Sequence, residues 1–285
     1  MNTPRGIDRR SVLAAATRLL AEAGVPSPEY DAAELLAHVL GTSRAQLFGI
    51  ETVPPGQLSE YDVLVERRAH REPLQHLTGV AHFRHVTLAV GPGVFVPRPE
   101  TELLAGWAVE AASTRDRPVV LDLGTGSGAI AAAVAHEVPA ARVHALELDV
   151  RAHQWAERNL AGTGVDLRQG DLATAFDDLT GKVDVIVSNP PYIPLEAWES
   201  VAPEARDHDP ELALWSGGDG LEAIRVIEVR AAVLLRPGGV IGVEHADVQG
   251  ETAPGVFAGS GRWADVKDHH DLADRPRFLT ARLAP

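Results

Sequence analysis

The sequence predicts an α/β protein with an open, mostly parallel sheet and a small helical domain ahead of it. Two observations carry this prediction. Val119–Leu123 and Val183–Ser188 are short, largely apolar runs, typical of strands that are buried on both faces. The first run leads directly into a glycine-rich turn and an alanine-rich helix, which is how a βαβ unit begins. Residues 1–78, in contrast, show only helical patterns.

Length and composition describe an ordinary globular chain. With 285 residues, 45% of them hydrophobic and 23% charged, the protein is long enough for one large and one small domain. The formal net charge of −14 argues against binding to phosphate backbones, because such binding relies on clustered Lys and Arg. The absence of cysteine excludes disulfides, thiolate metal sites and a cysteine nucleophile, and it favours a cytoplasmic location.

The N-terminal segment predicts an amphipathic helix and no export signal. Arg9 and Arg10 superficially match a twin-arginine signal, but Arg18 and Glu22 interrupt the apolar stretch that such a signal requires. The apolar residues instead fall on one helical face. No stretch approaches the ~18 consecutive apolar residues of a membrane helix, so we expect no association with a membrane.

Helical segments and a hairpin precede the sheet. The helices are expected after Asp8, from Tyr30 to Leu40, from Ser43 to Phe48, and from Gln57 to His70. Alternating apolar residues in 79–97, broken by Gly91-Pro92-Gly93, predict a β-hairpin that links two domains. We therefore divide the chain into a helical domain at 1–78, a hairpin linker at 79–97 and a sheet domain at 98–285. The helical domain has no catalytic constellation, which favours partner recognition over a purely structural role.

The turn Gly124-Thr125-Gly126-Ser127-Gly128 separates the first strand from a helix at Ala129–His136. Glycine lets the backbone approach a ligand closely, and a helix N-terminus presents free N–H groups. A second strand, Arg142–Leu146, ends in Glu147, where an acidic residue reaches a ribose diol in nucleotide-binding βαβ units. Read as Gly124-x-Gly126-x-x-Ala129, the turn also matches the dinucleotide fingerprint, so an NAD-dependent oxidoreductase is a rival at this point.

Two further strands end in polar residues. In the acidic turn at 169–172, Asp171 is suited to accept from an adenine amino group and Leu172 to pack on the ring. The next strand delivers Asn189 to the same edge of the sheet. An adenosine cofactor lies along the carboxyl ends of such strands, with Asn189 at its reactive end. Because a dinucleotide enzyme has no evident use for Asn-Pro-Pro-Tyr there, this order favours an adenosine cofactor over NAD.

Asn189-Pro190-Pro191-Tyr192 is suited to hold a planar amide or amino group. Proline fixes φ and has no N–H, so the Pro190 carbonyl is free to accept a hydrogen bond. Together with the Asn189 side-chain oxygen it offers two acceptors to one –NH2 group, and Tyr192 supplies an aromatic face. Taken alone, the motif has an alternative interpretation as a strand that ends in a proline-braced turn.

The rest of the chain completes the sheet. Leu221–Leu235 predicts a helix, Val240–Glu244 a strand, and Trp263–Val266 with Phe278–Leu283 a closing pair of strands. Two histidine groups, His82 with His85 and His269-His270-Asp271, have spacings that suggest a metal site. Neither has a full ligand set in the sequence, so we expect no metal and place the second group in a solvated loop.

In these motifs the chain resembles the class I, Rossmann-like methyltransferases that use S-adenosylmethionine. More narrowly, it resembles the peptide chain release factor N5-glutamine methyltransferase family. The motifs that carry the resemblance span nearly the whole chain: Arg71–Gly79, Pro97–Glu102, Asp122–Gly128, Ser188–Ile193, Gly217–Leu221, Leu235–Gly239, Glu244-His245 with Gln249, and Asp271–Phe278. The amino-methylating members of this class are marked by [D/N/S]-P-P-[Y/F], and in these methyltransferases the last strand of the sheet is antiparallel.

The resemblance implies S-adenosylmethionine as cofactor, S-adenosylhomocysteine as product, and 98–285 as the methyltransferase domain. It implies that Gly124, Thr125, Gly126, Ser127, Gly128, Glu147, Asp171, Leu172 and Asn189 bind the cofactor. It implies substrate binding by Asn189, Pro190, Pro191 and Tyr192, of which Asn189, Pro190 and Tyr192 are the catalytic residues. The chain departs from the family pattern at Leu172, often aromatic, at Asp274, usually glycine, and at His82-Phe83-Arg84.

Three functional hypotheses follow. Methylation of the glutamine in the Gly-Gly-Gln loop of class 1 release factors leads, with those factors as partners. Methylation of adenine or cytosine amino groups in nucleic acid is the alternative, and the acidic charge and lack of a basic recognition domain count against it. A catalytically idle adenosine-binding regulator is third, and the complete Asn-Pro-Pro-Tyr counts against it. Cytosine-C5 methylation is excluded because it needs a cysteine thiolate.

Overall fold

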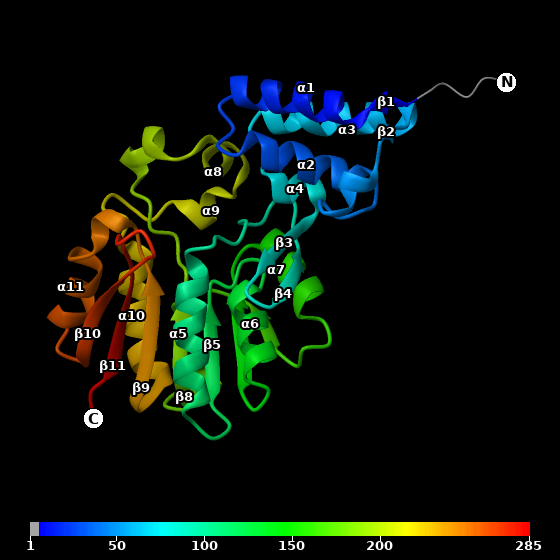
Figure 1. The fold of residues 1–285 in the computed structure, drawn as a ribbon. Helices are drawn as coiled ribbons and strands as arrows, with labels where there is room; N and C mark the ends of the chain where they lie inside the picture. Colours follow the sequence, from blue (N-terminus) through cyan, green and yellow to red (C-terminus); the bar gives the residue numbers. More distant parts are fainter. Residues whose placement is uncertain (1–5) are drawn as a thin grey trace. The chain divides into compact units, whose positions relative to one another are not determined.

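The structure is a computed structural model that describes residues 6–285. Within it the chain forms two compact units (Figure 1). The first, the helical unit, comprises the residues up to Val80 together with Ala202–His208. The second, the sheet unit, comprises Ala81–Val201 and Asp209–Pro285. The return of residues 202–208 to the helical unit is not apparent from the sequence.

Short helices around one apolar core make up the helical unit. Its elements are α1 Arg9–Glu22, α2 Pro28–Val39, η1 Gln46–Gly49, α3 Pro55–Ala69, α4 Leu74–Thr78, α8 Pro203–His208, and the strand pair β1 Ile7–Asp8 with β2 Thr52–Val53. Asp8 caps α1 as predicted, because its Oδ2 accepts from the Ser11 N–H at 2.8 Å. The expected helix at Ser43–Phe48 is instead the single 3₁₀ turn η1. At the centre of the core, the buried Tyr61 hydroxyl donates to the Ala32 carbonyl at 3.0 Å.

Arg68 in the last turn of α3 and Arg71 just beyond it hold α8 within the helical unit. Glu204 of α8 accepts from Arg71 Nε at 2.7 Å, from Arg71 Nη2 at 2.6 Å and from Arg68 Nη2 at 2.9 Å. Arg68 also donates to Asp31 at 2.7 Å. Burial by itself raises the pKa of Glu204, but the hydrogen bonds from Arg71 and Arg68 outweigh it and bring the pKa to about 2. Arg71 makes this bidentate ion pair from a left-handed backbone position, with φ at 67°.

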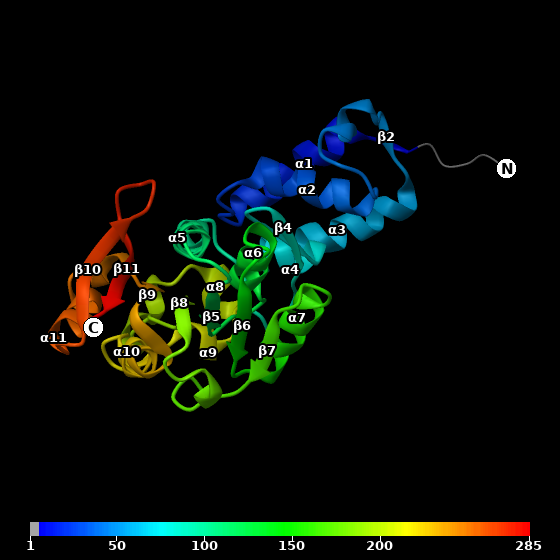
Figure 2. The same cartoon turned by 90° about the horizontal axis from the view of Figure 1, so that it is seen from below.

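Seven strands form the main sheet of the sheet unit. Their order is β10-β11-β9-β8-β5-β6-β7, which can be followed in Figure 2. The parallel strands are β5 Val119–Leu123, β6 Arg142–Glu147, β7 Asp166–Gln169, β8 Val183–Ser188 and β9 Leu235–Glu244. β11 Pro276–Leu283 runs antiparallel between β9 and β10 Trp263–His270. The predicted mostly parallel sheet with an antiparallel closing strand is therefore confirmed.

Helices cover both faces of this sheet. α5 Thr101–Ser113, α6 Ala129–Glu137 and α7 Val150–Leu160 pack on one face, and α10 Glu222–Leu234 and α11 Thr252–Gly259 pack on the other. Consecutive residues of β5 divide between the two cores, Val120 with the first group of helices and Leu121 with the second. Alternate side chains of a strand point to opposite faces, so a strand buried on both faces is apolar throughout, as the sequence of β5 indicates.

The remaining short elements are β3 Val80–Phe83, β4 Val86–Ala89, η2 Asp177–Leu179, η3 Leu195–Ser200, α9 Glu211–Leu214 and η4 Asp247–Gln249.

The predicted position of the turn in the hairpin linker is wrong. The hairpin turns between β3 and β4 at Arg84 and His85, not at Gly91-Pro92-Gly93. Arg84 adopts a φ of 48°, in the left-handed region that usually requires glycine. Its Nε and Nη2 donate to the two carboxylate oxygens of Glu137, each at 2.6 Å. Gly91 instead allows close packing, since a Cβ there would lie 2.7 Å from Trp155 Cζ2.

His269 and His270 also lie elsewhere than predicted, since they are the last residues of β10 rather than part of a solvated loop. The His269 ring stacks on Phe278 of the neighbouring β11, with 4.6 Å between ring centroids. Its Nε2 lies 2.8 Å from the Thr280 hydroxyl. Asp271 begins the connecting turn and pairs with Arg277 at 3.1 Å. Within residues 6–285, no group of three or more His, Asp or Glu side chains is arranged to hold a metal ion.

Asp274 explains one departure from the family pattern. It stands at φ 59°, in the left-handed region where a glycine has no steric cost. Its carboxylate accepts from the His270 ring at 2.8 Å if Nδ1 carries the proton.

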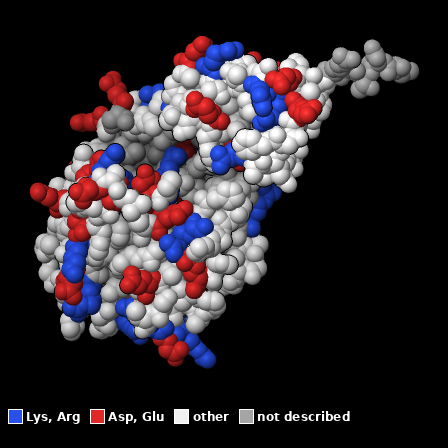
Figure 3. Space-filling model, in the orientation of Figure 1, with Lys and Arg blue, Asp and Glu red and all other residues white. Residues whose placement is uncertain are grey.

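On the face of the molecule in Figure 3, Lys and Arg side chains lie interspersed with Asp and Glu. None of the helices in the described residues is long and apolar enough to cross a membrane.

Candidate active site

The carboxyl ends of the parallel strands form one edge of the sheet, which we call the carboxyl edge. Gly124 follows β5, Glu147 ends β6, Asp171 lies two residues after β7, and Asn189 follows β8. The strand order puts these positions side by side in the sequence Asn189, Gly124, Glu147, Asp171. Glu244, which ends β9, extends the row on the far side of Asn189. The structure therefore gathers the residues for which the sequence predicts cofactor and substrate contacts, although their roles remain predictions.

The glycine turn after β5 has the conformation that its sequence predicts. Gly124, Gly126 and Gly128 have φ values of 74°, 58° and 85°, in the left-handed region that other residues avoid. A methyl group added at Gly124 or Gly126 would meet nothing within 4 Å, so open space faces the turn at both positions. Gly128 is required for packing, because a Cβ there would lie 3.0 Å from Leu160 Cγ.

Asp122, for which the sequence indicates a place in the strand and in the Asp122–Gly128 motif but no role, holds this turn in place. Its Oδ2 accepts from the Thr125 hydroxyl at 2.6 Å and from the Ala131 N–H, in the first turn of α6, at 3.1 Å. Burial raises the pKa of Asp122 to about 7, and its Oδ1 has no hydrogen-bond partner among residues 6–285. An acid inside an otherwise apolar strand is the sequence signal that indicates such a role.

Glu147 faces the glycine turn. Its Oε2 accepts from the Gly126 N–H at 2.8 Å, and its Oε1 accepts from the N–H groups of Leu148 and Asp149 at 2.8 and 2.9 Å. Burial raises its pKa, and these backbone hydrogen bonds partly offset the rise. A carboxylate fixed beside open, glycine-lined backbone offers acceptor oxygens to which the hydroxyls of a ribose diol can donate. The residues present therefore fit an adenosine cofactor.

Asp171 and Leu172 differ in exposure. Asp171 is exposed, and its Oδ1 accepts from the Ala173 N–H at 2.8 Å, which shapes the turn after β7. Leu172 is half-buried and packs against the core on the α10 side of the sheet. Both lie at the carboxyl edge beside Glu147, and their contact with an adenine ring stays a prediction.

Asn-Pro-Pro-Tyr is held at both ends by side chains from other elements. Ser188, the residue before it, donates its hydroxyl proton to the Leu123 carbonyl at 2.6 Å. The Asn189 Nδ2 donates to Thr101 Oγ1 at the start of α5, at 3.2 Å. The Tyr192 hydroxyl donates to Glu244 Oε1 at 3.2 Å. Burial is the main cause that raises the Tyr192 pKa above its usual value, so the hydroxyl stays protonated near neutral pH.

Gln249 and Gly220 brace the same segment from behind. Gln249 Nε2 donates to the Tyr192 carbonyl at 3.1 Å and to the Asp219 carbonyl at 3.3 Å, and Gln249 Oε1 accepts from the Ala246 N–H at 3.0 Å. A Cβ at Gly220 would collide with the Tyr192 carbonyl oxygen and approach Gln249 Nε2 to 2.7 Å. The motifs around Gly220 and Gln249 in the sequence are thus explained by contact with the Asn-Pro-Pro-Tyr backbone.

Arg98 of the Pro97–Glu102 motif binds an acid that sequence reasoning missed. Its Nη2 donates to Asp209 Oδ2 at 2.6 Å, and its guanidinium lies 4.7 Å from the centre of the Phe95 ring. The Asp209 side chain is fully buried, and burial raises its pKa to about 6. Asp209 is the first residue after the chain leaves α8, so this ion pair fixes where the chain re-enters the sheet unit.

Comparisons with known proteins find matches to both the helical part and the sheet part of the chain. Residues 11–79 match the PrmC N-terminal domain, and residues 87–205 match the methyltransferase small domain. The release factor glutamine methyltransferase of Streptomyces coelicolor is 59% identical, over 95% of this chain and 97% of the relative. The chain belongs to the release factor glutamine methyltransferase family. The family members from Mycolicibacterium smegmatis and Deinococcus radiodurans are 48% and 41% identical, over 95% and 96% of this chain and 96% and 98% of each relative.

Membership in the release factor glutamine methyltransferase family confirms the resemblance found in the sequence. It decides for a methyltransferase and against the NAD-dependent oxidoreductase that the glycine fingerprint also allowed. Among solved structures, the catalytic domain of hMettl16 in complex with MAT2A 3'UTR hairpin 6 superposes with a TM-score of 0.54 at 15% identity. The superposition covers 69% of this chain and 75% of that one, and it shows a shared fold.

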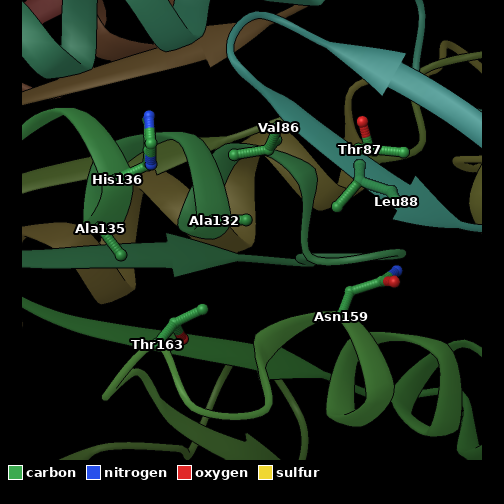
Figure 4. Close-up of a pocket in the computed structure, with 8 residues that line it drawn as sticks. All are labelled: Val86, Thr87, Leu88, Ala132, Ala135, His136, Asn159 and Thr163. Atoms are coloured by element: carbon green, nitrogen blue, oxygen red, sulfur yellow. The ribbon is translucent and has the colours of Figure 1, made fainter.

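A separate cavity of about 420 Å³ lies under the β3–β4 hairpin of this family member (Figure 4). It is lined by Val86, Thr87, Leu88, Ala132, Ala135, His136, Asn159 and Thr163. Asn159 Nδ2 donates to the Ala89 and Ser127 carbonyls at 2.9 and 2.8 Å, so its amide joins β4 to the glycine turn. Thr163 donates to the Leu160 carbonyl at 2.7 Å. The polar side chains of Asn159 and Thr163, which line the cavity, are thus engaged in structural hydrogen bonds.

Proposed function

We propose that this protein methylates the side-chain amide nitrogen (N5) of the glutamine in the Gly-Gly-Gln loop of peptide chain release factors, with S-adenosylmethionine as methyl donor. The observation that carries this proposal is the position of Asn189 and Pro190 at the carboxyl edge, one strand away from the glycine turn at 124–128. Membership in a family whose relatives are named release factor glutamine methyltransferase supports it.

Cofactor binding is assigned to the glycine turn and its neighbours along the carboxyl edge. S-adenosylmethionine, when bound, supplies an electrophilic methyl group on a sulfonium sulfur. Glu147 offers a carboxylate to the ribose hydroxyls, and the turn at 124–128 lets the backbone approach the ligand. Asp171 and Leu172 are the proposed adenine contacts. S-adenosylhomocysteine is the expected product.

The acceptor amide needs positioning more than it needs a base. A carboxamide nitrogen is a weak nucleophile, because its lone pair is delocalised into the carbonyl group. Asn189 Oδ1 and the Pro190 carbonyl offer two acceptors for the two N–H bonds of the substrate amide. Bonds to both acceptors orient the nitrogen and favour positive charge on it as it gains the methyl group, after which one of its two protons passes to solvent. Tyr192, with its hydroxyl tied to Glu244, keeps its ring in a fixed plane beside them.

Recognition of the release factor is assigned to the helical domain. None of the predicted site residues lies in this domain, which matches the PrmC N-terminal domain over residues 11–79. The net charge of −14 favours encounter with a basic, ribosome-binding partner, an effect that falls as salt rises. Glycines beside the target glutamine let the loop enter a narrow site without side-chain clashes. Such a partner places the protein in the cytoplasm.

Mass spectrometry of the substrate tests the function directly. Release factor incubated with the protein and isotopically labelled S-adenosylmethionine is digested with trypsin, and the peptide that holds the Gly-Gly-Gln loop is sequenced. One methyl group on the glutamine is expected, and far less methylation with the Asn189→Ala variant. Label on DNA or RNA with the release factor unmodified would reject the proposal in favour of nucleic-acid amino-methylation.

A further inference from the structure

We propose that Gln249 is a positioning residue for methyl transfer. Its side-chain amide holds the Tyr192 carbonyl, and through it the backbone that presents Asn189 and Pro190 to the substrate. This inference deepens the proposed function and rests on it, since Asn189 Oδ1 and the Pro190 carbonyl are taken as the acceptors for the substrate –NH2 group. It stands on three hydrogen bonds of one buried side chain.

The Asn-Pro-Pro-Tyr segment has few backbone groups with which to hold itself. Pro190 and Pro191 have no N–H, so carbonyl and side-chain groups must anchor most of this stretch. At its end, the Ile193 N–H donates to the Leu214 carbonyl at 2.9 Å. The Tyr192 carbonyl belongs to the same peptide group as the Ile193 N–H, and it needs a donor from elsewhere in the fold.

Gln249 supplies this donor from the end of η4. The residue is only 4% exposed. Its Nε2 donates to the Tyr192 carbonyl at 3.1 Å and to the Asp219 carbonyl at 3.3 Å, and its Oε1 accepts from the Ala246 N–H at 3.0 Å. Both N–H bonds of the amide therefore join two separate loops, the acceptor segment and the Gly217–Leu221 turn, and the amide oxygen ties them to the end of β9.

The orientation of the Gln249 amide follows from the groups around it. Its oxygen faces a backbone N–H, which can only donate, and its nitrogen faces two carbonyls, which can only accept. The reverse orientation would oppose N–H to N–H and oxygen to oxygen. This position therefore requires one acceptor and two donors on a single side chain, which is the set that glutamine carries.

The position of the Tyr192 carbonyl is transmitted to Pro190 because the chain between them is stiff. The rings of Pro190 and Pro191 fix both φ angles, and a residue before proline is restricted to extended ψ values. With so few free torsions, a displaced Tyr192 carbonyl moves the Pro190 carbonyl with it. A misplacement of about 1 Å can cost about 100-fold in rate, so a residue that acts only through the backbone affects turnover.

Kinetics of full-length variants test the proposal. Gln249→Met keeps the length of the side chain and removes all three hydrogen bonds. It should lower kcat on release factor by at least about 10-fold and leave KM within about 3-fold of wild type. Asp247→Asn, at an exposed position of the same η4 turn, is the control with the wild-type rate. S-adenosylmethionine affinity, measured by calorimetry, should stay within about 2-fold of wild type in both variants, which excludes unfolding as the cause.

Gln249→Glu gives a readout that depends on protons. An ionised carboxylate at this position only accepts, so it opposes the Tyr192 and Asp219 carbonyls. A protonated carboxyl group has one O–H to donate to the Tyr192 carbonyl, and its other oxygen still accepts from the Ala246 N–H. Protonation should therefore restore the bond that positions the acceptor segment, whereas Gln249→Met has no proton to regain.

Burial and neighbouring acids favour the protonated form of this introduced glutamate. The titratable residues on the elements next to Gln249 are mainly acidic: Asp247 on η4, Glu244 on β9, Asp268 on β10 and Asp219 in the preceding turn, with Arg225, Arg277 and His245 as their basic neighbours. The kcat of Gln249→Glu, divided by that of wild type at the same pH, should rise at least about 5-fold from pH ~9 to pH ~6. The same ratio for Gln249→Met should stay constant.

Two kinetic outcomes would overturn the proposal. Wild-type kcat in Gln249→Met would show that the volume of the side chain suffices. A Gln249→Glu ratio that does not change with pH would show that donation to the Tyr192 carbonyl has no part in turnover. A loss in Gln249→Met together with acid recovery in Gln249→Glu supports it, because a role in packing or in charge alone predicts only one of the two.

Hydrogen exchange in the free protein separates this inference from the proposed function. Followed by nuclear magnetic resonance, exchange of the Ile193 N–H should be at least about 10-fold faster in Gln249→Met than in wild type, and that of Val187 in β8 unchanged. If Ile193 responds in this way but wild type does not methylate release factor, the proposed function fails and Gln249 keeps its role in holding the segment. If wild type methylates release factor and Ile193 exchanges equally in both proteins, the positioning role fails.

Discussion

Glu204→Gln should destabilise the helical unit by about 3 kcal/mol at neutral pH. Arg68 and Arg71 bring the pKa of Glu204 from its ordinary 4.5 to about 2, and a shift of this size corresponds to about 3 kcal/mol of preference for the ionised, folded form. The Glu204 side chain is only 14% exposed, so solvent screens the ion pairs weakly. The loss also leaves a buried Arg68 without one of its partners.

The pH range in which Glu204 stabilises the fold follows from the direction of its pKa shift. Because the folded pKa lies below the unfolded value, the stabilisation is complete above about pH 4.5 and is lost as the pH falls toward 2. Wild type and Glu204→Gln should therefore differ at pH 7 and converge near pH 2, where both unfold more easily for other reasons as well.

Hydrogen exchange followed by mass spectrometry gives the assay, because it reports the opening free energy of α2 and α3 separately from the sheet unit. The matched control is Asp207→Asn in the same helix, where Asp207 pairs with Arg206 on an exposed surface and contributes little. Equal protection of α2 and α3 in wild type and Glu204→Gln at pH 7 would refute the reasoning. So would a loss in Asp207→Asn as large as in Glu204→Gln.

Three further predictions concern the active site. Glu147→Ala should weaken S-adenosylmethionine binding by about 1.5–3 kcal/mol, the range for hydrogen bonds to a charged group, as measured by calorimetry; unchanged affinity would remove Glu147 from the cofactor site. Asn189→Ala should abolish most turnover and leave much of the cofactor affinity, so a parallel loss of both would contradict the division of roles. Gly220→Ala, at φ 73°, should destabilise the fold by about 1–3 kcal/mol in urea unfolding, whereas Gly218→Ala, with nothing within 4 Å, should stay within about 0.5 kcal/mol. Similar urea midpoints for the two alanine variants would contradict this prediction, because they would show that the Tyr192 carbonyl moves away from the added methyl group at little energetic cost.

Local patterns determined the main elements of the sheet. The apolar runs of β5 and β8 and the glycines at 124–128 are signals carried by neighbouring residues, and each predicted the observed structure. Because the carboxyl ends of parallel strands meet at one edge, their order along the chain also placed Glu147 and Asn189 near the glycine turn. The family resemblance, given by motifs throughout the chain, was confirmed by relatives that match over nearly their whole length.

Local sequence signals failed where a residue adopts a conformation or position that is unusual for its residue type. Arg84 turns the hairpin in a left-handed conformation that sequence reasoning reserves for glycine, because its ion pair with Glu137 and the surrounding packing stabilise it. His269 joins a strand because its ring packs on Phe278, although its polar neighbours suggested a loop. In both cases tertiary contacts outweigh the local preference.

Only the tertiary structure decided which distant side chains meet. Arg68 and Glu204 are 136 positions apart, and Asn189 and Thr101 are 88 apart, so no periodicity relates them. The sequence contained each partner as one polar residue within a recognisable motif. The choice of partner depends on the strand order and on which side chains the packed helices and loops bury together. Hydrogen-bond energies are significant at these positions because buried polar groups must find partners there, and that burial exists only in the folded chain.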